Sequence, residues 1–178
     1  MAKDRKIDMV ILGLLSHEDL TGYDIKKRID QAVSFFWKGS FGSIYPALAV
    51  LEKQGLVQKL ESVPSGGREK IRYHITDTGI TFLKAWLNDT RASNELKYET
   101  LLKLFFNGVE DRSVALRNIN AFEKQVTDEL AFLRMCRGNL EKALDSDDHL
   151  YYFLTADFGV EACEAYLKWC ARARKMLR

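Results

Sequence analysis

The chain has 178 residues, 47% of them hydrophobic, and a formal net charge of only +2. This length can bury one good core or two small ones, and the charge balance is too even to identify a partner by itself. No apolar run approaches the length of a membrane span, and the first residues, MAKDRKIDM, lack a signal-peptide core, so we expect a cytoplasmic protein with no membrane partner.

Two amphipathic helices are predicted at the start of the chain. Residues 7–15 repeat apolar side chains at helical spacing and are followed by a polar segment, 16–19. Thr21 or Gly22 opens a second helix that directs three cations outward: Lys26, Lys27 and Arg28. Such a charge run is usually a solvated helix face. It also suits the first helix of a helix-turn-helix pair, which crosses the DNA backbone.

The third predicted helix covers residues 40–54. Ser40 is a good N-cap, and Gly55 supplies the stop at the other end. Pro46 cannot donate to the preceding turn, so it either kinks the helix or marks its true start near Ser43. The outer face carries small hydroxyl groups and Tyr45, which could reach a base edge or a phosphate. From this helix alone, an ordinary surface is an equally good interpretation.

A basic hairpin follows directly. An extended run begins at residue 56, the segment 63–67 (VPSGG) predicts a turn, and residues 71–75 alternate as a return strand. The tip or its neighbourhood carries Arg68, Lys70 and Arg72, placed where phosphate contacts need reach. A basic hairpin is often only a solvated sheet edge. After a glycine-stopped helix, however, it is typical of a winged helix-turn-helix, in which a helix enters the major groove.

The hairpin leads into another helix, capped by residues 76–79 and bearing apolar side chains from Phe82 to Leu87. Everything beyond it is predicted to be helical. Helices are expected over about 95–107, 112–144 and 157–176, with the acidic segment 145–149 as a connection.

The long helix 112–144 carries an apolar stripe that resembles a coiled-coil seam and has too little of its own chain to cover it. We therefore expect a homodimer, whereas a monomeric helical subdomain is the alternative. The candidate dimerisation residues are Ile119, Phe122, Val126, Leu130, Leu133, Leu140, Val160 and Leu167.

Aromatic side chains are dense in the second half and could line a pocket for a flat effector, although such stripes are more often core. No residue can be assigned to that pocket.

No catalytic or metal-binding pattern is found in the sequence. It has no glycine-rich phosphate loop, nucleophile elbow or plausible acid/base cluster, so we expect neither an enzyme nor a cofactor. The histidines are scattered without ligand spacing, so no metal site is proposed. The three cysteines form no C-x-x-C pair, and their expected role is packing in a reducing compartment: Cys136, Cys163 and Cys170.

Three segments together resemble the PadR family of bacterial transcription regulators: ILGLLSHEDLTGYDIKKRI, GSIYPALAVLEKQGLV and REKIRYHITDTG. The resemblance covers residues 7–88, and the C-terminal half, opening with YETLLKLFFNG, is similar to the longer PadR subgroup. It implies a dimeric repressor or activator that binds dyad-symmetric promoter DNA. In some members, phenolic or other aromatic compounds release the protein from DNA.

We thus expect a mainly α (α+β) chain, with a winged helix-turn-helix DNA-binding domain at 1–89 and a helical dimerisation and effector domain at 90–178. The expected function is that of a repressor that binds a palindromic operator in double-stranded DNA as a homodimer and is released by a small aromatic effector. The alternative is a winged-helix adaptor that binds protein and does not read DNA. The candidate DNA-binding residues are Lys26, Lys27, Lys38, Ser40, Gly42, Ser43, Tyr45, Pro46, Arg68, Lys70 and Arg72.

Overall fold

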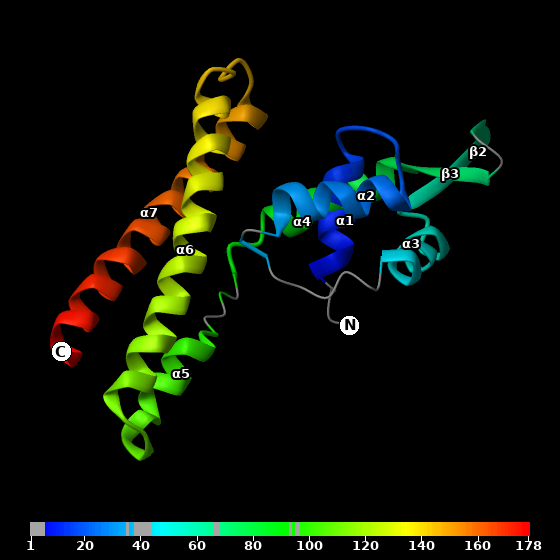
Figure 1. Ribbon diagram of the computed structural model, residues 1–178. Coiled ribbons are helices and arrows are strands. Elements are labelled where there is room, and N and C mark those ends of the chain that lie inside the picture. The colour runs from blue at the N-terminus through cyan, green and yellow to red at the C-terminus, as the bar shows by residue number, and fades with distance from the viewer. Residues whose placement is uncertain (1–5, 35, 38–43, 66–67, 93, 95–96) are drawn as a thin grey trace. The chain divides into compact units, whose positions relative to one another are not determined.

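The computed structural model (Figure 1) describes residues 6–34, 36–37, 44–65, 68–92, 94 and 97–178, with the backbone alone for 61–65 and 68–70. The chain divides into two compact units, Met1–Ser93 and Asn94–Arg178. In the described part of the chain, no helix combines the length and the apolar character that a membrane crossing requires.

The first unit packs helices against a small antiparallel sheet (Figure 1). Its elements, in chain order, are α1 (Lys6–Leu15), β1 (Leu20–Thr21), α2 (Gly22–Arg28), the π-helix η1 (Ile29–Val33), α3 (Ile44–Lys53), β2 (Val57–Ser65), β3 (Arg68–Ile75) and α4 (Asp77–Leu87). The strand order is β1-β3-β2. The apolar faces of the helices meet in one core, whose fully buried members include Ile11, Leu12, Ile25, Ile29, Leu48 and Leu51.

Local signals in the sequence set the ends of these helices. Thr21 caps α2 in a reciprocal capping box with Asp24, and Thr76 caps α4 by accepting from the backbone N–H of Gly79. Gly55 lies two residues after the end of α3 and adopts a φ of 71°, the left-handed conformation that ends a helix at lowest cost in glycine. The predicted stop of the third helix is therefore confirmed.

The hairpin differs from its prediction in two ways. Strand β2 extends to Ser65, so the prediction of a turn from residue 63 is wrong. Pro64 is accepted because β2 pairs with β3 alone and lies at the sheet edge, where its missing N–H is not needed. A third strand, β1, which was not predicted, pairs with β3 through Leu20 and Thr21.

The second unit is a helical hairpin. It contains α5 (Glu99–Phe105), the 3-10 turn η3 (Asn107–Val109), α6 (Arg112–Glu141) and α7 (Asp147–Leu177). The long helices α6 and α7 run antiparallel, side by side (Figure 1). The sequence predicts that the first helix of this unit begins near residue 95. That start is wrong for residues 97 and 98, which are described and lie before α5, because α5 begins at Glu99.

Helix α7 begins ten residues earlier than predicted, at Asp147. Ser146 caps it by accepting from the backbone N–H of His149, and Asp147 and Asp148 lie in its first turn, where carboxylates favour the helix dipole. The acidic run that resembled a connection is thus mostly a helix start.

The expectation that the stripe on α6 lacks chain to cover it is wrong, because α7 covers it. Five of the eight dimerisation candidates are buried within this chain: Ile119, Val126, Leu130, Leu133 and Val160. Close approach is aided by Gly159, where an added Cβ would lie 2.9 Å from Cδ1 of Leu133. Phe122, Leu140 and Leu167 are half-buried.

Candidate nucleic-acid interface

Helix α3 presents one buried and one exposed face. Ile44, Ala47, Leu48 and Leu51 are buried, whereas Tyr45 is 64% exposed. Pro46, Ala49 and Lys53 are exposed beside it. Four candidates just before α3 lie outside the described residues: Lys38, Ser40, Gly42 and Ser43.

The ring of Tyr45 packs against the first residue of α2. A Cβ built at Gly22 would lie 2.6 Å from Cε1 of Tyr45, closer than any side chain tolerates. Tyr45 therefore couples α3 to the N-terminus of α2, a contact that no sequence pattern indicated.

The cations of α2 have different surroundings. Lys26 Nζ lies 2.6 Å from Asp30 Oδ2, and this hydrogen bond raises the pKa of Lys26. Arg28 is paired with Glu18. Lys27 is exposed, and no hydrogen bond or ion pair joins it to another side chain of the described residues, which leaves its charge available to a phosphate.

The wing candidates separate into two groups. Backbone pairing places Arg68 opposite Ser65 and Lys70 opposite Val63, near the hairpin tip, but their side chains lie outside the described residues. Arg72 pairs with both Leu60 and Thr21, in the three-stranded part of the sheet. The prediction that Arg72 belongs to the tip is wrong.

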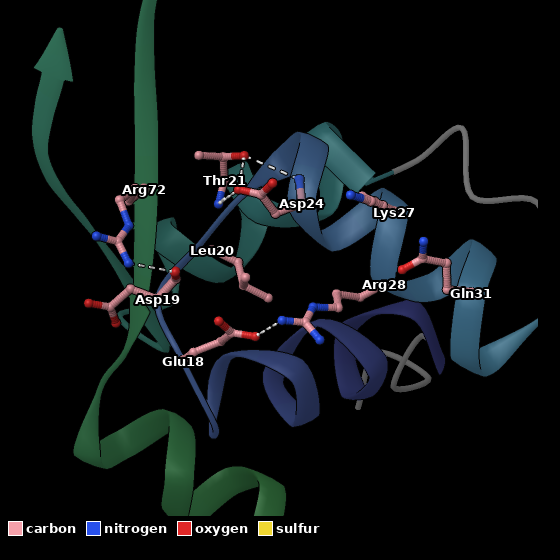
Figure 2. A pocket seen from close by; sticks show the side chains of 9 residues that line it. All are labelled: Glu18, Asp19, Leu20, Thr21, Asp24, Lys27, Arg28, Gln31 and Arg72. Atoms are coloured by element: carbon pink, nitrogen blue, oxygen red, sulfur yellow. Dashed lines mark hydrogen bonds and ion pairs between the residues drawn. The ribbon is translucent and has the colours of Figure 1, made fainter. Parts of the chain in front are cut away.

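A polar groove of about 530 Å³ opens between α2, the α1–β1 connection and β3 (Figure 2). Several of its charged side chains are held by neighbours within the groove. Arg28 faces Glu18, the Asp24 carboxylate accepts from the Thr21 hydroxyl, and Arg72 donates to the backbone oxygen of Asp19 at 2.9 Å. Across the described residues, no buried side-chain nitrogen or oxygen lacks a partner, and no three His, Cys, Asp or Glu residues gather as metal ligands.

The second unit contains an aromatic cluster that connects its helices. The Tyr98 and Tyr166 hydroxyls are hydrogen-bonded, and the Phe122 ring lies 5.9 Å from Tyr98 and 6.4 Å from Trp169, centroid to centroid. Burial raises the pKa of Tyr98. Beside Trp169, a mostly apolar cavity of about 240 Å³ opens between α5 and the end of α7, with the Arg172 side chain in its wall.

No disulfide bond joins the three cysteines, all of which lie in the described part of the chain. Cys163 and Cys170 are buried and Cys136 is half-buried. Burial raises the pKa of Cys136 and Cys170, which lowers their thiolate fraction and their reactivity.

Comparison with known proteins agrees with this architecture in both units. The model of the "Transcriptional regulator PadR-like family" matches residues 11–85, and that of the "Virulence activator alpha C-term" matches residues 96–178. The negative transcriptional regulator PadR of Bacillus subtilis (strain 168) is 31% identical over 156 residues, which cover 87% of this chain and 84% of that protein.

Two crystal structures of Bacillus subtilis PadR are also similar, each at 27% identity. The complex with operator DNA has a TM-score of 0.82 and covers 98% of this chain and 100% of that chain. The complex with p-coumaric acid has a TM-score of 0.76 and covers 97% of this chain and 99% of that chain.

Proposed function

The chain belongs to the PadR-like family of transcriptional regulators, and we propose that it binds a dyad-symmetric operator in promoter DNA as a homodimer and represses transcription. We assign DNA binding to residues 1–89 and dimerisation to residues 90–178. The observation that carries the proposal is the succession of α3 and the β2–β3 wing within one compact unit. That order suits a helix in the major groove and a wing on the adjacent backbone.

The proposed division of labour follows from side-chain type and position. Tyr45 and its neighbours on α3 face base edges, together with Ser40, Gly42 and Ser43 just before the helix. Lys26, Lys27 and Lys38 neutralise phosphates beside the helix, and Arg68 and Lys70 do so at the wing. Family membership favours this function over a winged-helix adaptor. We propose that the protein has no catalytic activity. We also propose that it acts in the cytoplasm, where a bacterial regulator meets promoter DNA.

The proposed dimer uses exposed surface rather than the buried stripe of α6. Large apolar side chains are exposed at both ends of the second unit, for example Phe105, Phe106 and Met176 at one end and Tyr151, Leu154 and Phe158 at the other. Exposed apolar surface of this kind is typical of a protein–protein interface, and we propose that a second copy of the chain covers it.

The charges of α7 suggest how the partner is oriented. Residues 147–164 carry five acidic side chains and neither Lys nor Arg, whereas residues 165–178 carry five basic side chains and neither Asp nor Glu. Two copies related by a twofold axis with antiparallel α7 helices would bring acidic halves beside basic halves.

A small aromatic compound is the proposed effector. Bacillus subtilis PadR has been crystallised with p-coumaric acid. In this chain the cavity beside Trp169 is lined almost entirely by apolar surface, which suits a flat ring, and the exposed Arg172 at its edge offers a cation for a carboxylate. Adding such a compound is expected to release the protein from its operator.

Sequencing of the genomic DNA fragments that the purified protein retains tests the proposed function. Enrichment of one inverted repeat within promoter regions is expected. Recovery of no DNA at low salt would instead support the adaptor.

A further inference from the structure

Asp19 lies directly before β1 and receives two contacts from β3. The Arg72 guanidinium donates to the Asp19 backbone oxygen at 2.9 Å (Figure 2), and His74 Nδ1 lies 2.6 Å from the Asp19 carboxylate oxygen Oδ1. Arg72 and His74 are two residues apart on a strand, so they share one face of the sheet. One residue of the α1–β1 connection therefore holds the exposed face of β3 at two points.

These contacts reinforce a short attachment of the wing to the rest of the unit. Strand β1 is only two residues long and pairs with β3 at Tyr73 and Arg72. The pairing of β2 with β3 shifts register between Leu60 and Val63, and a two-stranded hairpin alone is only marginally stable. The contacts of Asp19 with β3 add to the two backbone pairs through which β1 holds the wing.

The same connection continues into the helix-turn-helix. Thr21 ends β1 and caps α2, with its hydroxyl 2.7 Å from Asp24 Oδ2 and accepting from the Asp24 N–H. The N-terminus of α2 in turn carries the Tyr45 ring of α3 against Gly22. A continuous series of contacts thus leads from the wing through Asp19 and β1 to α3.

We propose that Asp19 is a positioning residue for DNA binding, which fixes the direction of the wing relative to α3 through Arg72 and His74. Arg72 then acts on the wing through Asp19 and makes no phosphate contact of its own. The inference rests on the proposed DNA binding and adds a residue outside the helix-turn-helix and the wing to the DNA-binding apparatus.

The sign of the effect separates this proposal from simple electrostatics. Removing a carboxylate from a DNA-binding unit lowers its repulsion of phosphates and should tighten binding. If Asp19 positions the wing, its loss must weaken binding instead. The adjacent Glu18 is a matched control, because it pairs with Arg28 of α2, and no hydrogen bond or ion pair joins it to the described side chains of β3.

The test compares Asp19→Ala with Glu18→Ala by fluorescence anisotropy on a duplex recovered with the wild-type protein. Asp19→Ala should bind roughly fivefold more weakly, the effect of about one hydrogen bond, while Glu18→Ala binds equally or more tightly. His74→Ala should reproduce the loss, and the double variant should be no weaker than Asp19→Ala alone. Circular dichroism melting identifies any variant that fails to fold. If Asp19→Ala is such a variant, Asp19→Asn decides, because it removes the negative charge without changing the size of the side chain and should weaken binding only if the contact with His74 positions the wing.

A salt titration of Arg72→Gln completes the test, because glutamine keeps a donor for the Asp19 oxygen but has no charge. An unchanged salt slope is expected, whereas a slope flattened by about 0.9 would identify a phosphate contact and overturn the role of Arg72. Equal affinities of Asp19→Ala and Glu18→Ala would overturn the role of Asp19. If the wild-type protein binds no duplex at low salt, the proposed function fails rather than this inference alone.

Discussion

Gly22 is the residue on which the position of Tyr45 depends. It opens α2, where alanine would ordinarily be the better helix former, yet the ring of Tyr45 occupies the place of its missing Cβ. Tyr45 and Gly55 could be singled out from sequence because a surface aromatic and a helix-stopping glycine are local signals. The contact between Gly22 and Tyr45 could not, since it joins residues that only the tertiary fold brings together.

Replacing Gly22 with alanine should therefore destabilise the protein and weaken DNA binding. The added methyl group displaces the Tyr45 ring, and because that side chain is 64% exposed and can swing toward solvent, the cost should lie at the low end of the roughly 1–3 kcal/mol of overpacking. Thermal melting and fluorescence anisotropy measure the two effects. Gly13→Ala is the matched control: an added Cβ at this position in α1 would have no atom within 4 Å, and the variant should gain about 0.5–1 kcal/mol of stability. A stabilised Gly22→Ala variant with unchanged DNA binding would contradict the role given to Tyr45.

The wing shows what a sequence pattern can and cannot predict about an element. Alternating apolar residues predicted β3, and the buried Tyr73 and Ile75 confirm the alternation at that end of the strand. The extension of β2 through Pro64 was missed because proline is excluded from central strands and only the sheet order shows that β2 is an edge. Strand β1 was missed because two residues carry no periodicity. The predicted helix that corresponds to α7 is too short, because an acidic run is equally typical of a connection and of a helix start.

For the wing itself, the double variant Arg68→Ala/Lys70→Ala should lose affinity to a similar extent for operator and scrambled duplexes. Both changes remove backbone-neutralising charge without altering base contacts, so the salt slope should flatten by about 0.9 for each lost phosphate contact. A salt titration of fluorescence anisotropy measures the slope. Retention of the wild-type slope would show that the wing tip is not a phosphate clamp.

At the scale of the whole molecule, the sequence predicted a dimer because the apolar stripe of α6 was expected to need a second chain to cover it, and the structure shows that it does not. The apolar stripe of α6 is covered within one chain, because its hairpin partner α7 begins earlier than the sequence predicts. The proposed dimer depends instead on exposed apolar side chains and on the separation of charge along α7. The exposed side chains could not be assigned from sequence, because a helical stripe does not reveal whether it is covered from within the chain. The charge separation is visible in the sequence, but only the structure places both halves on one continuous helix.

Charge reversal tests the antiparallel dimer. The variant Lys168→Glu/Arg172→Glu removes most of the positive charge of the basic half of α7, and Asp147→Lys/Glu161→Lys removes most of the negative charge of the acidic half. Each variant alone should dimerise more weakly than the wild type, because one member of every acidic–basic pair of halves then carries little net charge. Mixing the two should restore a species of about twice the 20.5 kDa chain mass in size-exclusion light scattering, since the unaltered halves can pair with each other. Variants that each remain fully dimeric would exclude charge pairing along α7.

The central claim is that two copies of this chain read one operator, and an equilibrium titration of a labelled operator duplex tests it most directly. Fluorescence anisotropy at fixed salt should saturate at two chains per duplex, with affinity at least about 10³-fold higher than for a scrambled duplex of equal length. Equal affinity for both duplexes, or saturation at one chain per duplex, would contradict the claim.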